Sequence, residues 1–103
     1  MKKAVVKIHE VRAGVFTEKN RTSYIFQYDE GYSGSPISLT MSVQTKAYEF
    51  DHFPPFFDGL LPEGIQLQGL LKINKIDKYD YFKQLLATGG DLVGAVTISN
   101  LDE

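Results

Sequence analysis

The side chains best suited to metal binding or catalysis are scarce in this sequence. It contains His9 and His52 but no cysteine, and neither histidine has acidic residues at a spacing that suggests shared metal ligation. A serine nucleophile on a Gly-x-Ser-x-Gly elbow needs a helix directly after the turn, whereas Gly34-Ser35-Pro36 lies in a loop-like segment. A Ser-His-Asp triad stays open, because triads assemble in space from distant residues. We expect no metal site and no catalytic residue.

Two further patterns could serve chemistry, and each has a plainer structural use. Asp58 and Glu63 could form a carboxylate pair, but both stand where a helix end is predicted. Gly89-Gly90-Asp91, followed by Gly94, has the composition of a phosphate-binding loop. Such a loop presents its N–H groups at a helix start, whereas these glycines follow a predicted helix. No Gly-x-x-x-x-Gly-Lys-Ser/Thr motif occurs, so we expect no nucleotide and no other cofactor.

Charge and composition limit the partners and the cellular compartment that we expect for this protein. The formal net charge is -2 and the pI is about 5.6, so no overall positive field draws a polyanion. The helical half carries a modest basic surface of Lys72, Lys75, Lys78 and Lys83. No apolar run reaches the length of a membrane span, and the first residues do not form a signal peptide. We expect one cytoplasmic domain spanning residues 1–103, without membrane or nucleic-acid contact.

The segment from Phe53 to Gly64 is the densest apolar cluster of the chain, and prolines and glycines interrupt it. These residues forbid one long helix and permit only short helical turns. We therefore predict a corner between a strand layer and a helix layer. The corner carries more large apolar side chains than one bend normally buries, and Ile65 follows at an exposed helix start. Leftover apolar groups of this kind are typical of a protein-binding edge.

Before the corner, alternation of apolar and polar residues predicts antiparallel strands. The strands are expected at residues 4–10, 15–18, 22–28 and 37–41. Turns are expected at Ala13-Gly14 and at 19–21, and a loop at 29–36. Tyr48 and Phe50 either extend the last of these strands or form a short edge strand. In the third strand Tyr24, Phe26 and Tyr28 share one face.

After the corner, the pattern predicts two helices and a closing strand. Pro62-Glu63 suits a helix start, and Leu67, Leu70 and Leu71 fall on one face of a helix that fades near Asn74. Asp77 is expected to cap a second helix, whose inner face is Tyr81, Phe82, Leu85 and Leu86 and which ends at Gly89. Residues 93–98 close the domain as a strand. The fold class is α+β: an antiparallel strand meander in the N-terminal half, short helices in the C-terminal half, and a closing strand at the end.

Two motifs carry a resemblance to a known family. They are Phe56-Phe-Asp-Gly-Leu-Leu-Pro-Glu-Gly64 and Gly89-Gly-Asp-Leu-Val-Gly-Ala-Val96, in this order and with a two-helix segment between them. Together with the strand-rich first half, they resemble the N-terminal subdomain of HipA-type Ser/Thr kinase toxins. The resemblance covers essentially the whole chain. None of the catalytic or phosphate-binding elements of the kinase body can be carried onto this sequence, so the resemblance implies the subdomain without the enzyme.

Stand-alone copies of this subdomain resemble HipS, the small member of HipB-HipS-HipT toxin–antitoxin systems. The resemblance implies that the chain binds and restrains a HipT-like Ser/Thr kinase, with a HipB-like DNA-binding antitoxin in a larger complex. The residues implied to bind the kinase are Leu61, Pro62, Glu63, Gly64, Ile65 and Gln66, with Ile65 inserted near the active site.

Two other functions remain open from the sequence. The chain could complete the kinase and bridge it to the HipB-like protein without inhibiting it, or it could be a small nucleic-acid-binding domain or enzyme that shares only the fold. Stacking on single-stranded nucleic acid would require exposed aromatics. The aromatic candidates are Tyr28, Tyr32 and Tyr48.

Overall fold

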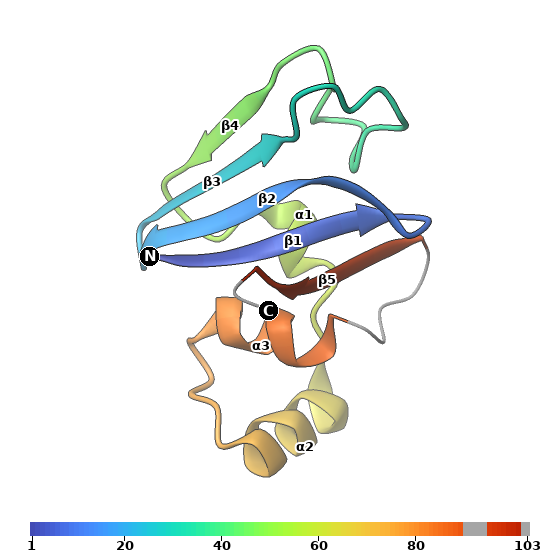
Figure 1. Ribbon diagram of the computed structural model, residues 1–103. Helices are drawn as coiled ribbons and strands as arrows, with labels where there is room; N and C mark the ends of the chain where they lie inside the picture. The colour runs from blue at the N-terminus through green and yellow to red at the C-terminus, as the bar shows by residue number, and fades with distance from the viewer. Residues whose placement is uncertain (90–94, 102–103) are drawn as a thin grey trace.

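An antiparallel sheet of five strands, in the order β4-β3-β2-β1-β5, forms the first layer of the molecule (Figure 1). The computed structural model describes residues 1–89 and 95–101. The strands are β1 (Lys2–Ile8), β2 (Val11–Asn20), β3 (Ser23–Tyr28), β4 (Ala47–Phe50) and β5 (Val96–Asn100), and the helices are α1 (Pro55–Asp58), α2 (Gly64–Asn74) and α3 (Tyr81–Thr88). This arrangement confirms the α+β class with a strand meander first and a closing strand last.

The hairpin between β1 and β2 turns at His9 and Glu10, so the predicted turn at Ala13-Gly14 is wrong. Both turn residues have positive φ, 50° and 69°, as a two-residue hairpin turn of type I′ requires. Gly14 instead lies inside β2, opposite Val6 and Tyr28. A Cβ on Gly14 would stand 2.3 Å from the carbonyl oxygen of Gln27. The glycine therefore permits close strand approach and does not mark a turn.

The predicted strand at 37–41 is also wrong, because these residues form a tight turn with one isolated bridge between Ser38 and Met41. The buried hydroxyl of Tyr28 holds this turn: it accepts a hydrogen bond from the Ile37 N–H at 3.0 Å and donates one to the Met41 carbonyl. The first N–H and the last carbonyl of this turn are thus satisfied by one side chain. One edge of the sheet is β4, which contains Tyr48 and Phe50.

The inner face of the sheet carries an aromatic cluster centred on Phe16. As predicted, Tyr24, Phe26 and Tyr28 share this face, and all three are buried. The ring of Phe16 stacks on Phe57 of α1 with centroids 4.0 Å apart, and it lies 5.4 Å from the ring of Phe82 of α3. One residue of β2 therefore packs against both helices that cover the sheet.

The helices begin and end close to the predicted positions. The prolines and glycines of the corner do limit α1 to four residues, and α2 does end at Asn74. The cap of α3 is Asp80 and not Asp77, because Asp80 Oδ1 accepts the Lys83 N–H whereas Asp77 Oδ1 accepts the Tyr79 N–H in the preceding loop. The predicted start of the last strand at position 93 lies outside the described residues.

Gly89 ends α3 where the helix meets β5. Its carbonyl accepts the N–H of Ile98 at 3.0 Å, and a Cβ would stand 1.9 Å from the Ile98 carbonyl oxygen. Its φ is -58°, so the glycine is required by close approach and not by a left-handed conformation.

Truncation of Phe57 to alanine tests the aromatic cluster. Because Phe57 is fully buried, we expect Phe57→Ala to lower the free energy of unfolding by about 3–5 kcal/mol through lost burial and a residual cavity. Phe56→Ala is the matched control, since that neighbour is only half-buried and should cost clearly less. Denaturant unfolding measures both variants, and equal losses would contradict the central role of Phe57.

Addition of one methyl group tests the contact at Gly89. We expect Gly89→Ala to lower the free energy of unfolding by about 1–3 kcal/mol, because the new Cβ overlaps the backbone of β5. Gly69→Ala is the control in α2, where a Cβ meets nothing within 4 Å. Thermal unfolding compares the two, and an unchanged midpoint for Gly89→Ala would refute the packing argument.

Candidate functional site

The corner between the layers is a series of tight turns. The N–H groups of Asp58 and Gly59 donate to the carbonyls of Pro54 and Pro55, and those of Leu60 and Leu61 donate to Phe57 and Asp58. The chain therefore turns once more after α1 before it reaches Pro62. These local hydrogen bonds fix the direction in which α2 leaves the core.

The residues predicted to bind a partner lie together at the end of this corner and at the start of α2. Leu61 and Pro62 are half-buried, whereas Glu63, Gly64, Ile65 and Gln66 are exposed. Gly64 has a φ of 60°, a conformation that suits glycine and few other residues. Glu63 stands at the N-cap without a side-chain hydrogen bond to the helix. The side chain of Ile65 is 87% exposed, as predicted.

An open groove of about 750 Å³ runs between the corner and α2. Its lining contains no ionisable side chain, so it offers apolar packing and not acid–base catalysis. Three of the predicted residues line it, whereas Glu63, Gly64 and Ile65 lie outside. The full lining is Gly59, Leu60, Leu61, Pro62, Gln66, Gly69, Leu70, Ile73, Asn74 and Thr88.

Sequence reasoning missed the second half of this surface, on α2 itself. Leu67, Leu70 and Leu71, which were predicted to share one face, are only half-buried, and no residue of the helix is fully buried. Ile73 is 81% exposed and lies two intervals of four residues after Ile65. That spacing was the available signal, because residues four apart share a helix face.

Between the two isoleucines, Gly69 occupies a position that gives it no evident role within this chain. A Cβ at Gly69 would meet nothing within 4 Å. Glycine inside a helix costs about 1 kcal/mol relative to alanine. The structure therefore shows a helix face of Ile65, Gly69 and Ile73 that lies open to solvent.

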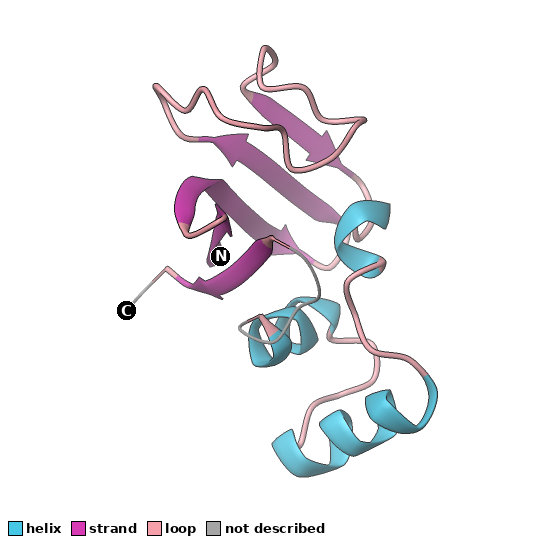
Figure 2. Ribbon diagram, turned by 90° about the vertical axis from the view of Figure 1, so that its right-hand side faces the viewer, coloured by secondary structure: helices cyan, strands magenta, loops and turns pink. Residues whose placement is uncertain are grey.

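Figures 1 and 2 show why α2 is so exposed: it lies beyond α3, at the end of the molecule away from the sheet. Its C-terminus is held through the following loop. Ile76 is buried, and its N–H donates to the Leu71 carbonyl. The buried side-chain amide of Gln84 in α3 donates to the carbonyls of Asp77 and Lys78.

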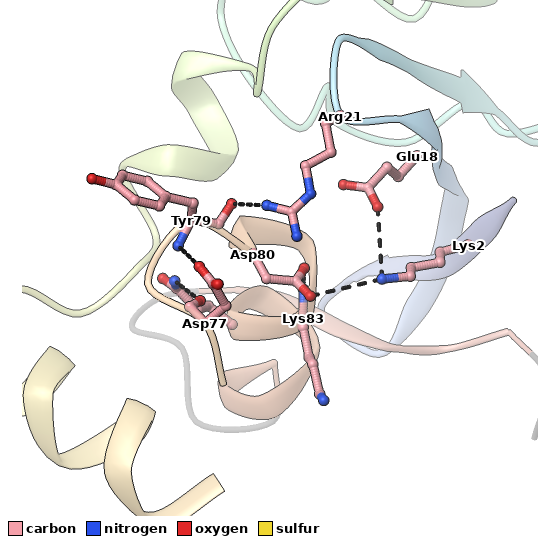
Figure 3. A network of polar contacts seen from close by, with 8 residues as sticks. Lys2, Glu18, Arg21, Asp77, Tyr79, Asp80 and Lys83 are labelled. Carbon is pink, nitrogen blue, oxygen red and sulfur yellow. Dashed lines mark hydrogen bonds and ion pairs between the residues drawn. The ribbon is translucent and has the colours of Figure 1, made fainter. Parts of the chain in front are cut away.

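A polar network ties this loop and α3 to the sheet (Figure 3). Arg21, in the turn between β2 and β3, donates to the Tyr79 carbonyl at 3.1 Å. Lys2 of β1 lies 3.8 Å from both Glu18 of β2 and Asp80 at the start of α3. The position of α2 therefore depends on contacts made at its two ends.

The remaining candidates for chemistry are not assembled into a site. Nδ1 of His52 lies 2.7 Å from Oδ1 of its exposed neighbour Asp51, and this hydrogen bond lowers the pKa of the Asp51 carboxyl. His9 lies at the tip of the first hairpin. Within residues 1–89 and 95–101, no three His, Cys, Asp or Glu side chains are grouped to hold a metal ion. No helix in the same residues combines the length and the hydropathy needed to cross a bilayer.

The aromatics suggested for nucleic-acid stacking do not form an exposed platform. Tyr28 is buried, and Tyr32 stacks on it with ring centroids 5.7 Å apart. The hydroxyl of the half-buried Tyr48 donates to the Ser42 carbonyl. The exposed Tyr79 lies instead beside Lys78, whose Nζ is 5.0 Å from the ring centroid. This arrangement does not favour single-strand binding through stacking.

Comparisons with known proteins agree with this architecture. Residues 4–99 match the family model of the HipA N-terminal domain. An uncharacterized protein of Haemophilus influenzae is 33% identical over 85 residues, which are 82% of this chain and 79% of that protein. Among solved structures, the N-terminal domain of HipA toxin superposes with a TM-score of 0.75 at 26% sequence identity. That match covers 96% of this chain and 92% of the other.

Tyr24 lies in β3 opposite Glu18, a member of the polar network in Figure 3. Its ionisation makes the free energy of unfolding depend on pH in the alkaline range. Burial, together with the nearby Glu18 carboxylate, raises the pKa of Tyr24 to about 12. The folded state therefore favours the neutral phenol, whose ordinary pKa is about 10. Its contribution to stability is complete below about pH 10 and is lost as the pH rises toward 12.

We expect the free energy of unfolding to fall between about pH 10 and pH 12, and to fall less steeply in the Tyr24→Phe variant. Part of the fall should persist in this variant, because burial also raises the pKa of Tyr28. Chemical denaturation at a series of pH values measures both slopes. Identical slopes for the variant and the natural chain would refute the assignment to Tyr24.

Proposed function

This chain belongs to the HipA N-terminal domain family, and from this membership we propose that it is a non-catalytic subunit that binds and restrains a HipT-like Ser/Thr kinase in the cytoplasm. It would do so in the manner of a HipS antitoxin, with a HipB-like DNA-binding protein as a further member of the complex. The proposed kinase-binding residues are Leu61, Pro62, Glu63, Gly64, Ile65 and Gln66.

The observation that carries this proposal is the exposure of Ile65 beside an apolar groove. Ile65 is a large apolar residue that is 87% exposed, and covering it with a partner lowers the free energy of the complex. Residues without ionisable groups line the adjacent groove. Such a surface, with an aliphatic anchor next to a shallow apolar depression, suits a protein partner better than a small polar substrate.

The rigidity of the corner supports tight binding of a partner. Pro62 has a fixed φ, and the turns after α1 are internally hydrogen-bonded. A segment held in its bound shape loses little entropy on association, which favours tight binding. The relative from Haemophilus influenzae is itself of similar length, because the 85 aligned residues make up 79% of it.

An alternative within the same family is a subunit that completes the kinase, and bridges it to the HipB-like protein, without restraining it. Both functions predict a stable complex, so copurification does not separate them. Kinase activity measured with and without the chain does, because only restraint lowers phosphorylation.

The test is co-expression of this chain with a HipA-like kinase from the same genome, with cell growth and complex formation scored together. We expect the natural chain to restore growth and to copurify with the kinase. Ile65→Asp should abolish the rescue and weaken binding by about tenfold or more, because a carboxylate replaces the apolar anchor. The variant should fold normally, since the side chain lies in solvent.

Leu39→Asp is the matched control, because Leu39 is equally apolar and is 102% exposed. It belongs to the loop between β3 and β4, which lies at the opposite end of the molecule from α2 (Figure 1). It should bind and rescue like the natural chain. A complex without rescue, and with unchanged phosphorylation by the purified kinase, would assign the alternative. Absence of any complex would refute both functions.

A further inference from the structure

The open face of α2 is complementary to itself. Ile65, Gly69 and Ile73 follow one another at intervals of four residues, so successive members drift by only about 40° around the helix axis. The two isoleucines are 87% and 81% exposed, and the glycine between them leaves the helix backbone uncovered. The pattern is large, small, large, and it reads the same in both directions along the helix.

We propose that α2 docks against α2 of a second copy of this chain, antiparallel and with the two-fold axis beside Gly69. In this arrangement Ile65 of one copy lies opposite Ile73 of the other, and the two glycines meet at the crossing point. A two-fold axis requires one patch to serve as both partners, and this sequence meets that requirement. The missing Cβ atoms allow the backbones to approach closely, because the distance between packed helices depends on the side chains at their contact.

The charges of α2 fit an antiparallel pair. The helix contains no acidic residue, and Lys72 is its single basic residue. In the antiparallel pair the two copies of Lys72 lie about 9 Å apart along the axes, so like charges are not juxtaposed. The exposed Glu63 at the start of one helix comes level with the exposed Lys75 at the end of the other. Antiparallel helix dipoles also place opposite partial charges at each end of the pair.

The size of the helix sets the strength of this contact. With 11 residues, α2 is only about 16 Å long, so the helix pair contributes less than the roughly 1,200 Å² of a stable interface. We therefore expect a weak dimer that forms with rising concentration. Self-docking also covers Ile65, so the dimer and the proposed kinase complex exclude one another; this consequence alone rests on the proposed function.

Single-cysteine variants test the register directly, because the natural chain has no cysteine. A disulfide requires Cα atoms within about 7 Å. With copper phenanthroline as catalyst and oxygen as oxidant, Gly69→Cys should form a disulfide-linked dimer, because oxidation traps the pairs that still form although the new side chain weakens the reversible contact. Ile65→Cys alone should not, because the two copies of position 65 lie about 12 Å apart along the axes. A mixture of Ile65→Cys and Ile73→Cys should form the mixed dimer.

Gln68→Cys is the control, since this exposed neighbour lies about 100° around the helix from Gly69. It should not cross-link above the background of a non-specific collision. If Ile65→Cys or Gln68→Cys links as fast as Gly69→Cys, the antiparallel register is refuted.

Sedimentation equilibrium of the chain without cysteine measures the same contact without cross-linking. We expect a monomer–dimer equilibrium that Ile73→Lys weakens by about tenfold or more, whereas Leu39→Lys, at an equally exposed apolar position, leaves it unchanged. Gly69→Ala should raise the helical circular dichroism signal yet weaken dimerisation, because its methyl group lies at the crossing point. A chain that stays monomeric at millimolar concentration would overturn the proposal, whether or not the same face binds the kinase.

Discussion

The stack of Phe16 on Phe57 is the contact on which the rest of the structure depends. It joins the middle strand of the sheet to α1, and Phe16 also contacts Phe82 of α3. The buried Phe57 anchors α1 on the sheet, and the hydrogen-bonded turns that follow α1 then lead the chain to α2. A buried contact on the sheet thus determines where an exposed helix stands. The surface of α2 is a consequence of packing in which α2 itself takes little part.

The sequence predicts well the parts of the fold that obey a local rule. Alternation placed Tyr24, Phe26 and Tyr28 on one face, and the prolines of the corner limited α1 to one turn. It fails where a distant group decides. The segment at 37–41 alternates like a strand, yet it turns, and the hydroxyl of Tyr28 binds the N–H at its start and the carbonyl at its end. Gly14 was predicted to lie in a turn, but it lies inside β2, where glycine is needed because the backbone of β3 approaches it closely.

The candidate site shows the same division. The position of Ile65 after Pro62-Glu63 was sufficient to predict an exposed apolar side chain, because this prediction needs only the geometry of a helix start. The groove and the exposed Ile73 could not be predicted in this way. They depend on the placement of α2 beyond α3, which the network around Lys2, Arg21 and Asp80 maintains. Helical periodicity predicted a shared face of leucines but not how far that face is covered, and the structure leaves it half-buried.

The order of the strands also has a consequence for synthesis of the chain. The last strand, β5, pairs with the first, β1, from Ala4 opposite Asn100 to Ile8 opposite Val96. A growing chain can assemble the β1–β2–β3–β4 meander from neighbouring segments, but the outer edge of β1 stays unpaired until β5 has been made. Contacts between such distant segments form late and slow folding. An open strand edge invites pairing with other chains, so the nascent protein is vulnerable to aggregation until β5 pairs with β1.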